Sequence, residues 1–257
     1  MSAHTWRRIL VGAGLVTAAV LPLTACVVPV DLPGNNSTSA SSAPGSSTAS
    51  TSPSQWTRAG RVLTMDEALT ALPQMPPAGE DEDVFTTDET NPLLADRSSE
   101  PPECVDILRL GETAASLEEH HAASARREWS EPTVTYSVTI RSFTQPVGPA
   151  LLDHAGAALA TCSNFRLTGT DDDGTFEDSM RTAPRTVSTL GEQTFAARVQ
   201  TFVSHEGRDL DFYSDQLTVR VGHNLVEAKA THQVETTGMQ RLETLVRHML
   251  AELEETP

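Results

Sequence analysis

Residues 133–143, TVTYSVTIRSF, carry the clearest strand pattern of the chain. Apolar side chains alternate with polar ones over nine residues, and β-branched residues are frequent, which is typical of a strand with one buried face. The apolar positions are Val134, Tyr136, Val138 and Ile140. We therefore expect one face of this strand to lie in the core of a sheet.

The residues after this strand change the period of the pattern. In PVGPALLDHAGAALATC (146–162), apolar residues recur at helical spacing, and Pro149 is tolerated in a first turn. The stripe consists of Val147, Leu151, Ala155, Ala158 and Cys162. This predicts a helix that presents Cys162 to the interior.

Three more segments predict strands. Residues 194–203, 216–221 and 225–232 alternate apolar and polar side chains, with turn residues at 206–207 and 222–224. An apolar stripe at helical spacing then covers 239–253. Antiparallel strands with a helix in the middle and one at the end predict an α+β fold. We expect a single domain, a meandering and mainly antiparallel sheet with helices packed on one face, and one disulfide.

The first part of this domain has a less regular pattern. Thr64 precedes Glu67 by three residues, which predicts a capped short helix over 65–72. The acidic, proline-containing stretch 79–103 predicts a solvated loop, and 104–110 predicts one or two helical turns. Residues 113–129 are compatible with a helix that runs into a strand near Trp129.

The amino terminus has the features of an export signal. Arg7 and Arg8 precede a short apolar stretch from Ile9 to Leu23. The residues 23–26, LTAC, resemble the lipobox of bacterial lipoproteins, in which small residues lead into a cysteine that receives a lipid. This predicts a lipoprotein signal peptide over 1–25, lipidation of Cys26 and anchoring to the extracytoplasmic face of the cell membrane. The alternative is an ordinary signal peptide with an incidental cysteine.

A linker should separate the lipid from the domain. From Asn35 to Ser54, twelve of twenty residues are Ser or Thr and none is charged, so the segment cannot form a packed core. We expect residues 26–57 to be the lipidated cysteine and a disordered linker, and 58–257 to be the folded domain. The net charge of −17 argues against nucleic acid as a partner.

The remaining cysteines, Cys104 and Cys162, would lie in an oxidising compartment. We expect them to pair, which closes a loop worth about 4 kcal/mol in the chain-entropy account. The alternative is two free thiols.

No convergent catalytic or metal motif emerges. The acidic run Asp171–Gly174 does not match an EF-hand loop and favours a hairpin tip. His120 and His121 follow two glutamates, but the second Glu-x-x-His unit of a di-iron site is missing. Nucleophile elbows and phosphate loops are also missing. We therefore predict no catalytic residue, no metal and no cofactor, and the ligand-binding residues are unknown.

The segments PPECVDIL (101–108), ALATCSNFRLTG (158–169) and VRVGHNLVEAKATH (219–232) resemble the family of PknH-like extracellular sensor domains. This family occurs on a mycobacterial-type receptor kinase and on actinobacterial lipoproteins. The resemblance implies an α/β sensor domain with a cleft for an extracellular ligand, and it supports the Cys104–Cys162 pairing. Members often have a second disulfide, whereas this chain has no cysteine after Cys162.

These observations lead to three ranked hypotheses. The first is a lipid-anchored cell-envelope protein whose domain binds or senses an envelope ligand or a protein partner without catalysis. The second is a lipid or glycolipid carrier, which would need a long apolar lining. The third is an envelope hydrolase that uses dispersed acidic residues.

Overall fold

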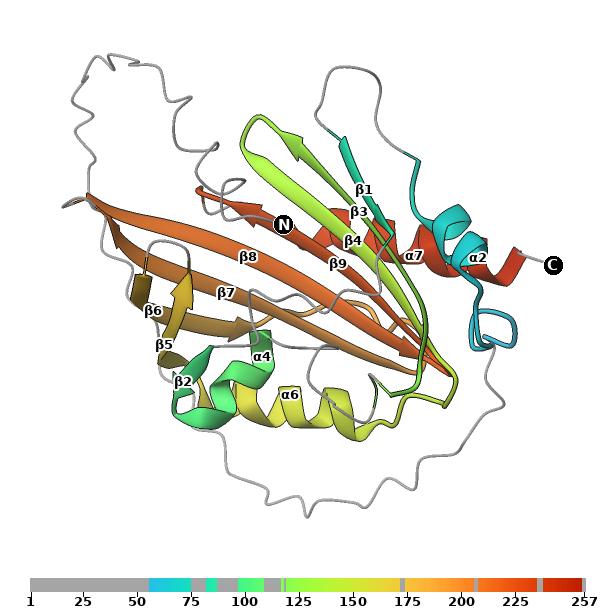
Figure 1. The fold of residues 1–257 in the computed structure, drawn as a ribbon, viewed down its shortest axis with the longest axis horizontal. Coiled ribbons are helices and arrows are strands. Elements are labelled where there is room, and N and C mark those ends of the chain that lie inside the picture. Colours follow the sequence, from blue (N-terminus) through green and yellow to red (C-terminus); the bar gives the residue numbers. More distant parts are fainter. Residues whose placement is uncertain are drawn as a thin grey trace, which may run out of the picture. The chain divides into compact units, whose positions relative to one another are not determined.

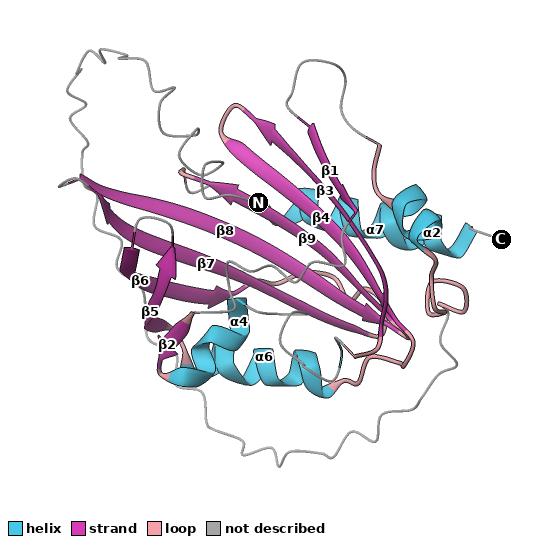
Figure 2. Ribbon diagram, in the orientation of Figure 1, coloured by secondary structure: helices cyan, strands magenta, loops and turns pink. Residues whose placement is uncertain are grey.

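The computed structural model describes residues 56–74, 82–86, 97–108, 117, 119–171, 174–205, 208–234 and 238–255. These residues form a nine-stranded antiparallel sheet in the order β1-β3-β4-β9-β8-β7-β6-β5-β2 (Figure 1). The strands are β1 (Glu82–Thr86), β2 (Ser98–Glu100), β3 (His121–Glu131), β4 (Val134–Phe143), β5 (Asn164–Asp171), β6 (Gly174–Pro184), β7 (Gln193–His205), β8 (Arg208–Val221) and β9 (Asn224–His232). The helices are α2 (Met65–Ala71), η1 (Pro102–Cys104), α4 (Val105–Leu108), α6 (Ala150–Thr161) and α7 (Met239–Glu255) (Figure 2).

The strand predicted from the alternating pattern is β4, and it lies between β3 and β9. Its residues Tyr136, Val138 and Ile140 are at most 6% exposed and belong to the largest apolar cluster. Helix α7 covers this cluster with Leu242, Val246, Met249, Leu250 and Leu253. The predicted α+β class and antiparallel sheet are therefore confirmed.

The placement of the helices differs from the prediction, which put them on one face of the sheet. In β7, Ala196 belongs to the cluster under α7, whereas its neighbours Phe195 and Ala197 belong to a second cluster with α4 and α6. Successive strand residues point to opposite faces, so α2 and α7 cover one face and α4 and α6 the other. The cause is that β7 contributes apolar residues to both sides: Phe195, Ala197 and Val199 pack with α4 and α6, and Ala196 packs under α7.

Two segments of the domain adopt structure that the local pattern did not predict. The stretch expected to be a solvated loop contains β1 and β2, which pair with β3 and β5. Strand β3 begins at His121, in the segment where helix and strand were both compatible. Its pairing with β4 stacks the ring of Trp129 on that of Tyr136 at 5.3 Å, so tertiary packing outweighs helix propensity here.

The segment before α2 is part of the core. Ala59 is fully buried, and the Asn224 side-chain amide donates to the carbonyl oxygens of Ala59 (2.6 Å) and Arg61 (2.8 Å). Gly60 packs directly on Gly222 in the β8–β9 turn, where a Cβ on Gly222 would lie 2.2 Å from the Gly60 oxygen. Residues 59–61 therefore join the turn at this end of the sheet.

Candidate functional site

Four neighbouring strands carry polar side chains on the sheet face opposite α7. We call this surface the polar face. It consists of Ser124, Arg126, Glu128 and Ser130 of β3; Thr135, Ser137, Thr139 and Arg141 of β4; Glu227, Lys229 and Thr231 of β9; and Ser214, Gln216, Thr218 and Arg220 of β8. Among the described residues that pair across these four strands on this face, the one apolar residue is Leu225, at the end of β9.

The polar face follows from the alternation in the sequence. Most even-numbered residues of β4 and β9 are buried in the cluster under α7, and Val138 and Ala228 are fully buried. A strand has a side-chain period of two, so burial of these residues directs Thr139, Glu227 and their equivalents to the other face. The sequence pattern contained this signal, but sequence reasoning used only the apolar half of it.

Glu227 occupies the middle of the polar face. Its carboxylate accepts a hydrogen bond from the Thr218 hydroxyl at 3.3 Å and lies 3.7 Å from the Arg141 guanidinium. The side chains of Arg141 and Glu227 are 18% and 19% exposed. The pair is therefore reachable from solvent while being held in place by three strands.

A second ion pair lies on the neighbouring strand. Arg126 pairs with Glu128 and donates from Nε to the Ser137 hydroxyl at 3.0 Å. Its side chain is 38% exposed, and Lys229 on β9 is exposed as well. The polar face thus offers hydrogen-bond donors and acceptors and charges of both signs.

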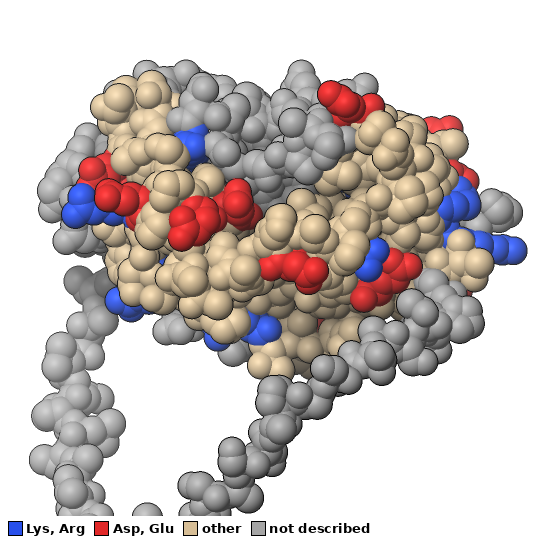
Figure 3. Space-filling view, turned by 90° about the horizontal axis from the view of Figure 1, so that it is seen from below, with Lys and Arg blue, Asp and Glu red and all other residues tan. Residues whose placement is uncertain are grey.

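Helices α4 and α6 border the polar face. Gln216 donates from its amide to the carbonyl oxygen of Ile107 in α4 at 2.9 Å, and α6 packs on β7. Seen from below, where α6 lies, the molecule has interspersed acidic and basic groups and no single charged patch (Figure 3). The contacts at this border therefore hold the two helices on the sheet, and the polar face lies on the strands beyond them.

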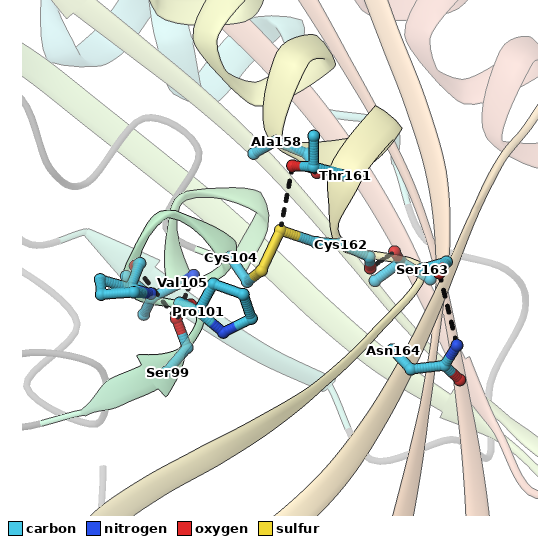
Figure 4. Close-up of a disulfide and its surroundings, with 11 residues drawn as sticks. Ser99, Pro101, Cys104, Val105, Ala158, Thr161, Cys162, Ser163 and Asn164 are labelled. Carbon is cyan, nitrogen blue, oxygen red and sulfur yellow. Dashed lines mark hydrogen bonds between the residues drawn. A yellow bond between two sulfur atoms is a disulfide. The ribbon is translucent and has the colours of Figure 1, made fainter.

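The predicted disulfide joins η1, directly before α4, to the end of α6. Cys104 at the end of η1 and Cys162 at the end of α6 form a bond with a Cα–Cα distance of 5.5 Å, and both residues are fully buried (Figure 4). Nearby, the Val105 amide donates to the Ser99 hydroxyl at 2.8 Å, which connects α4 to β2. The disulfide is structural because neither sulfur atom is accessible.

A buried charged cluster lies on the other face, near the start of α7. The Asp215 carboxylate is 0% exposed and accepts two hydrogen bonds from Arg198, at 2.7 and 2.6 Å. His232 Nε2 lies 3.3 Å away, and Arg185 lies at 3.6 Å. Burial raises the pKa of Asp215, but Arg198, His232 and Arg185 outweigh this effect and hold the pKa below its ordinary value. The cluster ties together β7, β8 and β9.

Sequence reasoning missed this cluster. His232 belongs to no sequence motif, yet its side chain is 1% exposed and its ring stacks on Tyr213 at 5.6 Å. The ring of His121 lies edge-on to that of Phe143, and His223 Nδ1 lies 2.9 Å from the Phe143 carbonyl oxygen. The described residues contain no group of three His, Cys, Asp or Glu side chains that could hold a metal ion.

The remaining sequence-based expectations have different outcomes. Cys26, the signal peptide and the linker up to residue 55 lie outside the described residues. Asp171 and Gly174 pair at the end of the β5–β6 hairpin, in agreement with the expected hairpin tip. In the part of the chain that the structure describes, no helix is long and apolar enough to cross a membrane.

Comparison with known proteins supports the architecture. The extracellular domain of PknH from Mycobacterium tuberculosis superimposes with a TM-score of 0.54 over 77% of this chain and 100% of that domain, at 12% sequence identity. The chain has a PknH-like fold. A putative uncharacterized protein from Mycobacterium smegmatis, an Rv0999 ortholog, gives a TM-score of 0.40 at 12% identity, over 68% of this chain and 88% of that one. No family model and no curated protein matches the sequence.

Proposed function

We propose that the protein is a lipid-anchored cell-envelope lipoprotein whose extracytoplasmic domain binds a polar ligand on the polar face, without catalysis. The observation that carries the proposal is the asymmetry of the sheet. One face of β3, β4, β9 and β8 is packed under α2 and α7, whereas the other presents polar side chains with charges of both signs. An antiparallel sheet often has one solvated polar face. What favours recognition here is that this face holds two partly exposed ion pairs, Arg141–Glu227 and Arg126–Glu128, in fixed positions on neighbouring strands.

Two further findings support the proposal. The PknH-like fold is one that a solved extracellular domain also uses, and the lipobox-like LTAC sequence at 23–26 would attach the chain to a membrane. The apolar side chains that a lipid carrier would need are largely buried against α7 and α2. This ranks the carrier hypothesis second and envelope hydrolysis third.

The anchor is tested in cells that modify lipoproteins. The full chain and a Cys26→Ala variant are expressed with labelled palmitate and separated by detergent phase partitioning. We expect label and detergent-phase recovery for the wild type and neither for the variant. Equal labelling of both proteins would exclude Cys26 as the lipidation site.

The binding function is tested by native mass spectrometry of the full chain in detergent, before and after incubation with envelope extract. We expect a polar adduct that is lost when Lys229→Glu and Glu227→Gln are combined. The matched control is Arg181→Gln, at an exposed position outside the polar face. A lipid adduct would favour the carrier, and degraded envelope polymer would favour the hydrolase. An adduct that still forms with the double variant would exclude the polar face as the binding site.

A further inference from the structure

The charges on the polar face alternate in a regular way. Two neighbouring rows of register partners cross β3, β4, β9 and β8. The first row is Arg126, Thr139, Glu227 and Thr218, and the second is Glu128, Ser137, Lys229 and Gln216. In the first row the cation is on β3 and the anion on β9, whereas the second row has the opposite order.

The spacing of these charges follows from the sheet. Arg126 and Glu227 are separated by one intervening strand, and neighbouring strands lie about 4.8 Å apart. Their backbones are therefore about 10 Å apart. Between them lies Thr139, which is only 8% exposed, whereas the Arg126 side chain is 38% exposed. Two charged side chains of opposite sign thus flank a short hydroxyl side chain on the strand between them.

The side chains of this row are already held by neighbours. Arg126 contacts Ser137 and Glu128, and Glu227 contacts Thr218 and Arg141. Along the first row, a ligand with two charges of the same sign would be repelled by either Arg126 or Glu227. A ligand with one positive and one negative end would find a complementary group at each end.

We propose that the polar face binds a short peptide with a free ammonium group and a free carboxylate, laid across β4. This inference rests on the proposed function and specifies its ligand class. An extended peptide advances about 3.3 Å per residue, so three residues match the distance of about 10 Å. The peptide carboxylate binds the Arg126 guanidinium, and the ammonium group binds the Glu227 carboxylate; both contacts are charge-assisted hydrogen bonds.

The test uses isothermal titration of the full chain in detergent with trialanine as the probe. The same measurement is made with N-acetylated trialanine, with its carboxyl-amidated form, with a neutral disaccharide and with inorganic phosphate. We expect trialanine to bind at least tenfold more tightly than either capped form. Equal affinity for free and capped peptides, or no binding of trialanine, would overturn the proposal.

Two variants assign the ends of the peptide. Glu227→Gln should weaken trialanine binding at least tenfold and remove the preference over the N-acetylated form. Arg126→Gln, at a more exposed position, should instead remove the preference over the amidated form. Arg181→Gln should change neither preference. If both variants weaken all forms equally, the residues do not recognise the peptide ends, and the proposal is wrong.

The outcomes also separate this inference from the proposed function. If the disaccharide or another envelope molecule binds and Lys229→Glu with Glu227→Gln abolishes that binding, the peptide ligand is wrong while the polar face remains the site. If the envelope molecule still binds to the protein with both substitutions, the proposed site itself is wrong.

Discussion

Asp215 shows how a single residue can hold several strands together. Its carboxylate is buried on β8 and contacts Arg198 on β7 and His232 on β9. A buried ion pair adds little compared with apolar packing, but removal of one partner leaves the other charge without compensation. Asp215 is therefore a residue on which the arrangement of the central strands depends.

We expect Asp215→Ala to lower the free energy of unfolding by about 3–5 kcal/mol, because Arg198 would remain buried without its counter-ion. Urea denaturation of the full chain measures this difference. Asp211→Ala on the same strand is the control, because Asp211 is exposed, and it should cost less than about 1 kcal/mol. A loss of the same size in both variants would contradict the special role of Asp215.

Substitution by alanine should have opposite effects on stability at two glycines. Gly222 has a φ of +53°, and a Cβ there would collide with the backbone of Gly60, so Gly222→Ala should cost about 1–3 kcal/mol. Gly156 lies in α6, and a Cβ added there would have no neighbouring atom within 4 Å, so Gly156→Ala should stabilise the protein by about 0.5–1 kcal/mol. Thermal unfolding of the two variants measures both effects. A neutral Gly222→Ala would show that the turn can move away from residue 60.

At the scale of elements, α2 begins with the predicted capping box. The Thr64 hydroxyl accepts from the Glu67 amide at 3.3 Å, and the Glu67 carboxylate accepts from the Thr64 amide at 2.8 Å. Arg61 also donates to Glu67 at 2.6 Å. The hydrogen bond from Arg61 and those from Thr64 lower the pKa of Glu67 from 4.5 to about 2.

This lowered pKa predicts a pH dependence. Because the folded pKa lies below the unfolded one, the contribution of Glu67 is fully present above pH 4.5 and is lost as the pH falls towards about 2. Glu67→Gln removes the titrating group. The difference in unfolding free energy between wild type and variant should therefore shrink over this range, as urea denaturation at several pH values would show. A constant difference would mean that the carboxylate is not linked to folding through its charge.

Helix placement shows what an element alone does not decide. The apolar stripe of α7 correctly predicted a buried face with Leu242, Val246 and Met249. The stripe of α6 likewise predicted that Cys162 would be buried. Neither stripe specifies which face of the sheet receives the helix, because that depends on the connections and on the apolar residues Phe195, Ala197 and Val199 that β7 presents to α6.

At the scale of the whole molecule, the segment before α2 is part of the domain. Ala59 and Leu63 are buried, and the amides of Arg58 and Ala59 donate to Glu254 of α7. One compact unit extends from Ser54 to Pro257. The entry of the chain into the domain is thus held by both the β8–β9 turn and the last turns of α7.

We expect a chain that begins at Trp56 to unfold cooperatively, whereas one that begins at Thr64 should lose cooperative unfolding. The shorter chain lacks the backbone groups at 59 and 61 that bind Asn224, and it exposes the apolar surface beneath Ala59 and Leu63. Differential scanning calorimetry of both chains makes the comparison. Identical transitions would show that residues 56–63 do not support the core.

The sequence by itself determined the features that have a local period or a chemical rule. The alternation around Val138 predicts a strand, the stripe ending at Cys162 predicts a helix, and two cysteines in an oxidising compartment predict a disulfide. These predictions succeed because side-chain direction repeats every two residues in a strand and about every 3.6 in a helix. The tertiary structure decided everything that depends on register between distant strands. Only the pairing of β3, β4, β9 and β8 brings Arg126, Thr139 and Glu227 into one row, and only the pairing of β7, β8 and β9 buries Asp215 beside Arg198 and His232. Such contacts join residues far apart in the chain, and no local pattern specifies which strands become neighbours.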